Sequence, residues 1–230
     1  MARQLNLELY KFLTKDTKPS NDKYYLTLSN IQDQSHKSEI NQVVDSGLFS
    51  KEQFIGIDNN KKFITENNRK HPGAKWIHGN WNTILSKVDY DPALVYLDST
   101  YFGDKDPAFN AIKKTLDICG DNALVVANVM ATNPRAGLGE NEFDTKQLLK
   151  NLITDEPAAK YRKWNNQNPE MTIDELENSN MYIPCYDYKA SKTLMRSFIF
   201  YKGIIPSNKD FETFFAKFNE NFEKEFANAK

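Results

Sequence analysis

The chain has 230 residues, with 30 Lys and Arg against 31 Asp and Glu, so its formal net charge is -1. Hydrophobic residues make up 40% of it and charged residues 27%, which are ordinary proportions for a soluble globular protein. This length suffices for a single well-filled domain over residues 1–230. The balanced charge excludes a global attraction to nucleic acid but not a local basic patch.

The start of the chain and its cysteines predict a cytoplasmic protein. The first residues contain no apolar signal region, and no run of about eighteen apolar residues is present, so we expect no membrane association. Cys119 and Cys185 lack the spacing of metal ligands and the histidines are scattered, so no metal site is predicted. This cysteine usage fits a reducing intracellular setting.

Strand-like and helix-like patterns alternate from residue 24 to residue 130. Short continuous apolar runs predict buried strands, and apolar residues spaced three and four apart predict the helices between them. The predicted strands are 24–30, 54–58, 75–81, 93–97 and 122–129. The predicted helices are 38–48, 61–70, 82–87 and 107–118, after an amphipathic segment over 5–13. This alternation predicts parallel strands joined by crossover helices.

The pattern changes after residue 130. Residues 131–178 are irregular, and we interpret them as a lid or recognition insertion. Residues 182–188 and 193–201 are strand-like and too close together for a crossover helix, so they predict an antiparallel hairpin.

Residues 207–230 predict a C-terminal amphipathic helix. A helix packed on the core is favoured over one that docks a partner. Its phenylalanines recur at helical spacing, at Phe211, Phe214, Phe215, Phe218, Phe222 and Phe226.

Three of the predicted strands lead into polar side chains. The motifs are Ile55-Gly56-Ile57-Asp58, His78-Gly79-Asn80-Trp81 and Asp98-Ser99-Thr100-Tyr101. Ligands of open α/β sheets bind at the carboxyl ends of the strands, so these motifs predict a site at that edge.

The order of the elements and these motifs resemble the class I S-adenosylmethionine-dependent methyltransferases. In that family the last two strands form a hairpin that places an antiparallel strand within a parallel sheet. The resemblance covers residues 24–203 and implies an α/β fold: a Rossmann-like, mostly parallel sheet with helices on both faces and a C-terminal antiparallel β-hairpin. It also implies S-adenosylmethionine as the cofactor, with no metal.

The resemblance implies cofactor-binding roles after the second and third strands. Asp58, with Asn59 beside it, matches the acid that holds the ribose hydroxyls, because a carboxylate can accept two hydroxyl protons. The alternative is an Asp that caps the following helix. Asn80 and Trp81 match the positions that contact and stack on the adenine. The alternative there is a Gly-Asn turn with a core tryptophan.

The loop after the first strand departs from the family. The family has glycines there, which let backbone N–H groups approach the methionine end of the cofactor. This chain has no glycine between Leu28 and Ser35. The resemblance assigns cofactor binding to Ser29 and Asn30, and Asp33 is a candidate partner for the cofactor amino group.

The motif after the fourth strand resembles the Asp-Pro-Pro-Tyr motif of amino-group methyltransferases that act on nucleic-acid bases. Ser99 and Thr100 stand where that motif has prolines. The resemblance implies that Asp98 accepts from the target amine and that Tyr101 stacks on the extruded base. Asp98 would also line the cofactor site. The alternative is a strand-end Asp that caps the next turn.

Two functions follow from these patterns. The first is an S-adenosylmethionine-dependent methyltransferase acting on an amino group of a nucleic-acid base, with nucleic acid as the partner. The second is a catalytically inactive methyltransferase-like domain that serves as a binding or assembly module, which the glycine-free first loop favours.

Overall fold

The computed structural model describes most of the predicted strands and helices. The described residues are 2–28, 38–87, 89–99, 105–130, 182–190, 193–204, 206, 207, 209–211, 213, 214, 216–218 and 220. The predicted insertion over 131–178, the loop after the first strand and residues 221–230 lie outside them.

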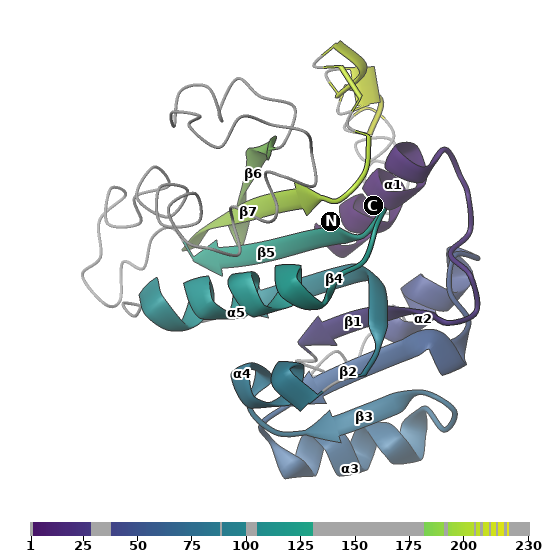
Figure 1. Ribbon diagram of the computed structural model, residues 1–230, viewed down its shortest axis with the longest axis vertical. Coiled ribbons are helices and arrows are strands. Elements are labelled where there is room, and N and C mark those ends of the chain that lie inside the picture. Colours follow the sequence, from purple (N-terminus) through teal and green to yellow (C-terminus); the bar gives the residue numbers. More distant parts are fainter. Residues whose placement is uncertain are drawn as a thin grey trace, which may run out of the picture.

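Seven strands form one sheet in the order β3-β2-β1-β4-β5-β7-β6 (Figure 1). They are β1 (Lys23–Leu28), β2 (Phe54–Asp58), β3 (Lys75–His78), β4 (Asp91–Ser99), β5 (Leu124–Met130), β6 (Tyr182–Ala190) and β7 (Thr193–Tyr201). Strands β1 to β5 pair in parallel, and β7 runs antiparallel to both β5 and β6. The predicted hairpin therefore places an antiparallel strand next to a parallel sheet, and this expectation is confirmed.

Helices cover both faces of the sheet, as predicted. They are α1 (Ala2–Thr14), α2 (Glu39–Asp45), α3 (Lys61–Lys70), α4 (Trp81–Ile84) and α5 (Lys105–Ile118), with 3-10 turns η1 (Lys51–Gln53) and η2 (Leu85–Lys87). Buried side chains of α4 and α5 pack in one apolar cluster, and those of α1, α2 and α3 pack in another. Alternate residues of β4 and β5 contribute to the two clusters, because successive strand side chains point to opposite faces.

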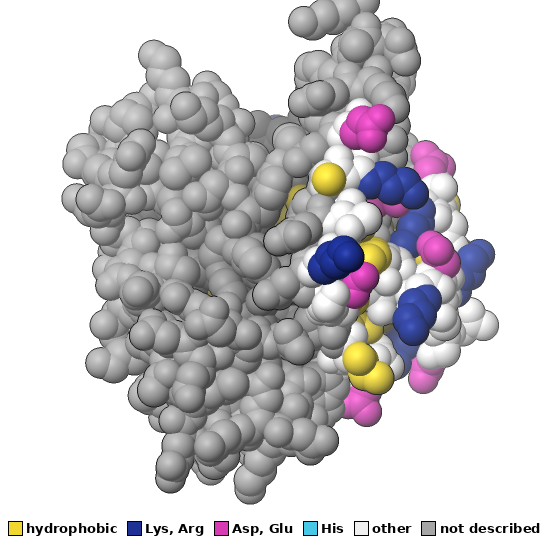
Figure 2. Space-filling model, turned by 90° about the horizontal axis from the view of Figure 1, so that it is seen from above, with side chains coloured by type: hydrophobic (Ala, Val, Ile, Leu, Met, Phe, Trp, Pro, Cys, Tyr) yellow, Lys and Arg dark blue, Asp and Glu magenta, His cyan; other side chains and the backbone are white. Residues whose placement is uncertain are grey.

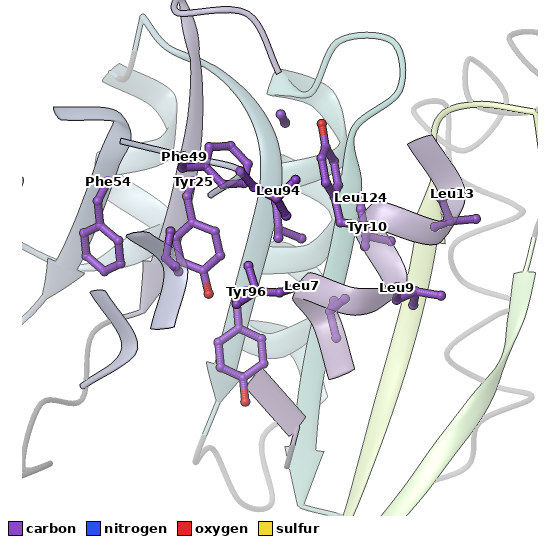
Figure 3. Close-up of a cluster of buried hydrophobic side chains, with 14 of the residues drawn as sticks. Leu7, Leu9, Tyr10, Leu13, Tyr25, Phe49, Phe54, Leu94, Tyr96 and Leu124 are labelled. Atoms are coloured by element: carbon purple, nitrogen blue, oxygen red, sulfur yellow. The ribbon is translucent and has the colours of Figure 1, made fainter. Parts of the chain in front are cut away.

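Tyrosines and leucines dominate the α1 face of the sheet (Figure 3). Leu7, Leu9, Tyr10 and Leu13 come from one stripe of α1 and lie against the strands. Leu9 is fully buried, so α1 is held mainly by apolar burial.

The described positions of residues 209–220 are helical, and they extend this α1 cluster. The ring of Phe12 lies 5.5 Å from that of Phe211 and 4.8 Å from that of Phe214, measured between centroids. Phe211 and Phe218 are buried, so phenylalanines at helical spacing in this segment do face the protein.

Several element boundaries differ from the sequence prediction, among them those of β3 and β4. Strand β3 ends at His78 rather than at residue 81, because the carbonyl of Asn80 already accepts hydrogen bonds from the amides of Thr83 and Ile84. Trp81 therefore begins α4 instead of ending a strand. Strand β4 extends beyond the predicted 93–97, because its last residues keep pairing with β5.

The C-terminal end of α5 is capped by Lys202, the residue that follows β7. The ammonium group of Lys202 donates to the carbonyl of Leu116 at 3.1 Å and to that of Cys119. These carbonyls lie at the negative end of the helix dipole, where a cation is favourable. Burial raises the pKa of the adjacent Cys119 thiol to about 12, so that thiol stays protonated at neutral pH.

We expect Lys202→Met to lower the free energy of unfolding by about 1–2 kcal/mol, because the last carbonyls of α5 lose a charged donor. Urea denaturation followed by circular dichroism measures this change. Lys209→Met is the matched control, since Lys209 is exposed at the start of the C-terminal helix. Equal stability of the two variants would contradict the capping role.

A buried polar pair joins β1 to α2. The hydroxyl of Tyr25 donates to the carboxyl of Glu39 at 2.6 Å, and the two residues are 1% and 2% exposed. A buried carboxyl that loses its donor carries the cost of desolvation without compensation. This pair therefore fixes the start of α2 against the strand.

Tyr25→Phe should lower the free energy of unfolding by about 1–3 kcal/mol, because it removes only the hydroxyl that faces Glu39. Tyr24→Phe is the internal control on the same strand. No described residue hydrogen-bonds the Tyr24 hydroxyl, and a phenylalanine ring still supports the ammonium of Lys75, which lies 4.7 Å from the Tyr24 centroid. If both variants lose the same stability in urea melts, the Tyr25 hydrogen bond contributes nothing specific.

Candidate functional site

The strand order reverses between β1 and β4. From β1 the chain moves outward through β2 to β3, and it then returns to β4 and continues to β5 and the hairpin (Figure 1). The crevice at such a switch point, outside the carboxyl ends of the strands, is where ligands bind in open α/β sheets. All three predicted motifs follow strands that end at this edge.

The ends of β2 and β3 are tied together by hydrogen bonds. The amide of Gly79 donates to the carbonyl of Asp58 at 2.9 Å. The Nε2 atom of His78 lies 3.1 Å from the carbonyl oxygen of Asn59, and since a carbonyl only accepts, Nε2 carries the proton. His78 is the last residue of β3, so its interpretation as a strand residue is confirmed.

The Asp58 carboxylate lies half-buried at the end of β2. Its Oδ1 atom accepts from the amide of Asn60 at 2.6 Å, and no described residue donates to Oδ2. Burial raises the pKa of this carboxyl, while the Asn60 amide and the nearby His78 act in the opposite direction. The capping alternative therefore holds in part, because Oδ1 accepts a hydrogen bond in the turn before α3. Oδ2 remains available to accept a hydrogen bond from a ligand.

Asn80 and Trp81 follow the end of β3 with different exposures. Asn80 is exposed, whereas Trp81 is 6% exposed and its ring packs in the α4 and α5 cluster. The Trp81 indole Nε1 is buried without a hydrogen-bond partner in the described part of the chain. A Cβ on Gly79 would come within 2.8 Å of Ile84, so a residue without a side chain lets this turn close.

The motif after β4 is described only in part. Asp98 is the penultimate residue of β4, and its backbone pairs with Asn128 of β5. Strand β1 lies between β2 and β4, so Asp58 and Asp98 flank the central strand. Tyr101, Ser29 and Asn30 lie outside the described residues, as does Asp33. The roles of all these residues, with those of Asn59, Asn80 and Trp81, stay predictions.

A second buried polar pair supports this edge. The amide nitrogen of Asn128 donates to the hydroxyl of Tyr96 at 2.5 Å, and both residues are almost fully buried. Figure 3 shows the hydroxyls of Tyr25 and Tyr96 both pointing toward the carboxyl ends of the strands. The sequence interpretation did not single out Glu39 or Asn128. A tyrosine inside an apolar strand run was the available signal, because a buried hydroxyl needs a partner.

Metal binding finds no support in the described residues. No cluster of His, Cys, Asp and Glu there could hold a metal ion. On the described part of the face seen in Figure 2, basic and acidic side chains are interspersed, so no single-sign patch is visible there. None of the described helices is long and apolar enough to cross a bilayer.

Comparisons with known proteins give matches only among solved structures. No protein-family model matches the sequence, and no curated protein matches it. The N-methyltransferase NodS from Bradyrhizobium japonicum WM9, in complex with S-adenosyl-L-homocysteine, is similar with a TM-score of 0.50 and 9% identity, over 86% of each chain.

Two further solved structures have slightly lower scores. The plantazolicin methyltransferase BamL, in complex with a triazolic desmethylPZN analog and SAH, has a TM-score of 0.49 and 13% identity over 87% of this chain and 85% of that chain. An rRNA methylase from Streptococcus thermophilus has a TM-score of 0.44 and 9% identity over 83% and 92%. The sheet order and the likeness to NodS show that this chain has the Rossmann-like fold of class I S-adenosylmethionine-dependent methyltransferases.

Proposed function

We propose that this protein is an S-adenosylmethionine-dependent methyltransferase whose acceptor is an amino group of a nucleic-acid base. The observation that carries the proposal is the Asp58 carboxylate at the carboxyl edge of the sheet. It is half-buried, bonded by a single amide through Oδ1, and has Oδ2 left to accept. A carboxylate in this state suits the vicinal hydroxyls of a ribose, which need two acceptor positions.

The polar side chains around Asp58 fit the remaining parts of the cofactor. Asn59 and Asn80 are exposed at the ends of β2 and β3, where an amide side chain can meet the edge of an adenine. The Trp81 indole, next to Asn80 in the sequence, is buried and has an N–H without a partner in the described part of the chain. Ser29 and Asn30, at the loop after β1, would meet the methionine end.

Catalysis by such a site consists mainly of positioning. Bound S-adenosylmethionine supplies a methyl group already activated on a sulfonium, so the protein need not generate an electrophile. Asp98 would accept a hydrogen bond from the acceptor amine and so orient its lone pair. Tyr101 would stack on the base and hold it in line.

Removing the charge of Asp58 should weaken cofactor binding. Asp58→Asn keeps an oxygen for the Asn60 amide but loses the charged acceptor, so S-adenosylhomocysteine should bind about 10- to 100-fold more weakly by calorimetry. Its stability at neutral pH should not fall, because the raised pKa means that ionised Asp58 opposes folding.

The matched control for this prediction is Asp117→Asn on the exposed side of α5, which should bind S-adenosylhomocysteine like the original chain. Loss of stability in Asp58→Asn with unchanged ligand affinity would reduce Asp58 to a helix-capping residue. No binding of S-adenosylhomocysteine by the original chain at millimolar concentration would favour the inactive binding module instead.

Removing the Tyr101 ring should weaken methyl transfer to the acceptor base. Tyr101→Ala should lower methyl transfer to base amines in unmodified RNA or single-stranded DNA about 10- to 100-fold, because stacking on the base is lost. Tyr101→Phe keeps the ring and should retain most of the transfer. Transfer is measured with radiolabelled S-adenosylmethionine, and S-adenosylhomocysteine affinity should be equal in both variants.

Two results would contradict the proposed acceptor without contradicting the proposed cofactor. Transfer that is equal in Tyr101→Ala and Tyr101→Phe contradicts base stacking while leaving the methyltransferase proposal intact. Transfer to a small-molecule or protein amine with none to nucleic acid contradicts the nucleic-acid acceptor.

A further inference from the structure

The turn that follows β2 is connected to the end of β3 by a side chain. Asp58 and His78 are paired positions of these two parallel strands, so their side chains leave the sheet on the same face. The Nε2–H group of His78 donates to the carbonyl of Asn59 at 3.1 Å. A side chain of β3 therefore holds the backbone directly after Asp58, the residue that carries the proposed function.

Different hydrogen bonds hold the successive residues of this turn. The carbonyl of Asp58 accepts from the amide of Gly79 at 2.9 Å, and its Oδ1 atom accepts from the amide of Asn60 at 2.6 Å. The side chain of Asn60 caps the start of α3. Asn59 lies between these two residues, and the His78 ring is the group that bonds its carbonyl.

The side chain of Asn59 depends on that bond for its direction. It is exposed and has no hydrogen-bond partner in the described part of the chain, so only its own backbone orients it. The bond from His78 fixes this backbone, and with it the peptide group that joins Asn59 to Asp58. Groups that bind a ligand need their orientation fixed by the residues behind them.

His78 also affects the charge of Asp58. Histidine side chains take up a proton between about pH 5 and 8, and a protonated ring still donates from Nε2. Burial raises the pKa of Asp58, and His78 is the charged side chain, among those that the structure describes, that lowers it. Lys61 and Lys62, the nearest cations along the chain, are exposed on α3. A positive charge on His78 therefore opposes the protonation of Asp58 as the pH falls.

We propose that His78 is a positioning residue of the cofactor site. By holding the Asn59 carbonyl, it fixes the turn that presents Asp58 and Asn59 to the ribose of S-adenosylmethionine. This inference rests on the proposed function, because it takes Asp58 as the acceptor of the ribose hydroxyls. His78 acts through its neighbours and does not itself contact the ligand.

Calorimetry with S-adenosylhomocysteine on variants of the full chain tests this role. His78→Phe keeps a planar ring without an N–H donor, and at about pH 8 it should bind S-adenosylhomocysteine about threefold to tenfold more weakly. His78→Gln places an amide N–H as many bonds from the backbone as Nε2, so it should bind like the original chain at that pH. His71→Gln is the matched control, since His71 lies at the far end of α3 and its loss should change nothing.

The pH dependence provides a readout that a purely structural tie would not change. Glutamine cannot carry the positive charge, so the affinity of His78→Gln should begin to fall at a higher pH than that of the original chain. Carbon nuclear magnetic resonance of the ligand-free proteins should agree, with a higher pKa for Asp58 in His78→Gln. His71→Gln should match the original chain in both measurements.

The outcomes distinguish this inference from the proposed function. An original chain that binds S-adenosylhomocysteine no better than His78→Phe overturns the inference and leaves the proposed function standing. Binding by His78→Gln that is as weak as that of His78→Phe at about pH 8 also overturns it, because the donor is then not what matters. Equal pH dependence in His78→Gln and the original chain overturns the effect of His78 on the charge of Asp58. An original chain that binds no S-adenosylhomocysteine overturns the proposed function, and this inference with it.

Discussion

The parallel pairing of β1 with β2 on one side and β4 on the other is the interaction on which the rest of the structure depends. It makes β1 the central strand of the parallel part of the sheet and forces the chain to return across it between β3 and β4. The β1–β4 register is shifted between Tyr24 and Tyr25 and pairs Thr27 with Tyr96 near the carboxyl end of β1. Because β1 lies between β2 and β4, the backbone positions of Asp58 and Asp98 lie on either side of it.

The two edges of the sheet use polar groups differently. At the amino-terminal edge, Lys23 with Asp91 and Lys202 with the end of α5 neutralise charges that the fold itself presents. At the carboxyl edge, polar pairs such as Tyr25 with Glu39 lie below the surface and hold the strand ends in place. The exposed Asn80 follows the end of β3 at this same edge.

The helices and strands could be predicted from local sequence patterns. Features that depend on contacts between distant parts of the sequence could not. The bounds of β2 and α3 follow the apolar spacing and the Asn60 cap, whose signals all lie within a few residues. Trp81 continued an aromatic pattern across Gly79, and only the helical hydrogen bonds to Asn80 show that the strand has ended. The partners of buried tyrosines depend on tertiary contacts that no local pattern encodes.

Folding raises the pKa of the Asp58 carboxyl and lowers that of Asp210. A carboxyl whose pKa is raised on folding destabilises the fold as pH rises through the interval between its unfolded and folded values, and this cost persists above it. Asp210 is the opposite case: hydrogen bonds from Ser207 lower its pKa, so its ionised form stabilises the start of the C-terminal helix. Folding alone would favour a neutral side chain at position 58. An acid at that position fits the proposed cofactor-binding role, in which the ligand needs its charge, as well as the turn in which Oδ1 accepts from Asn60.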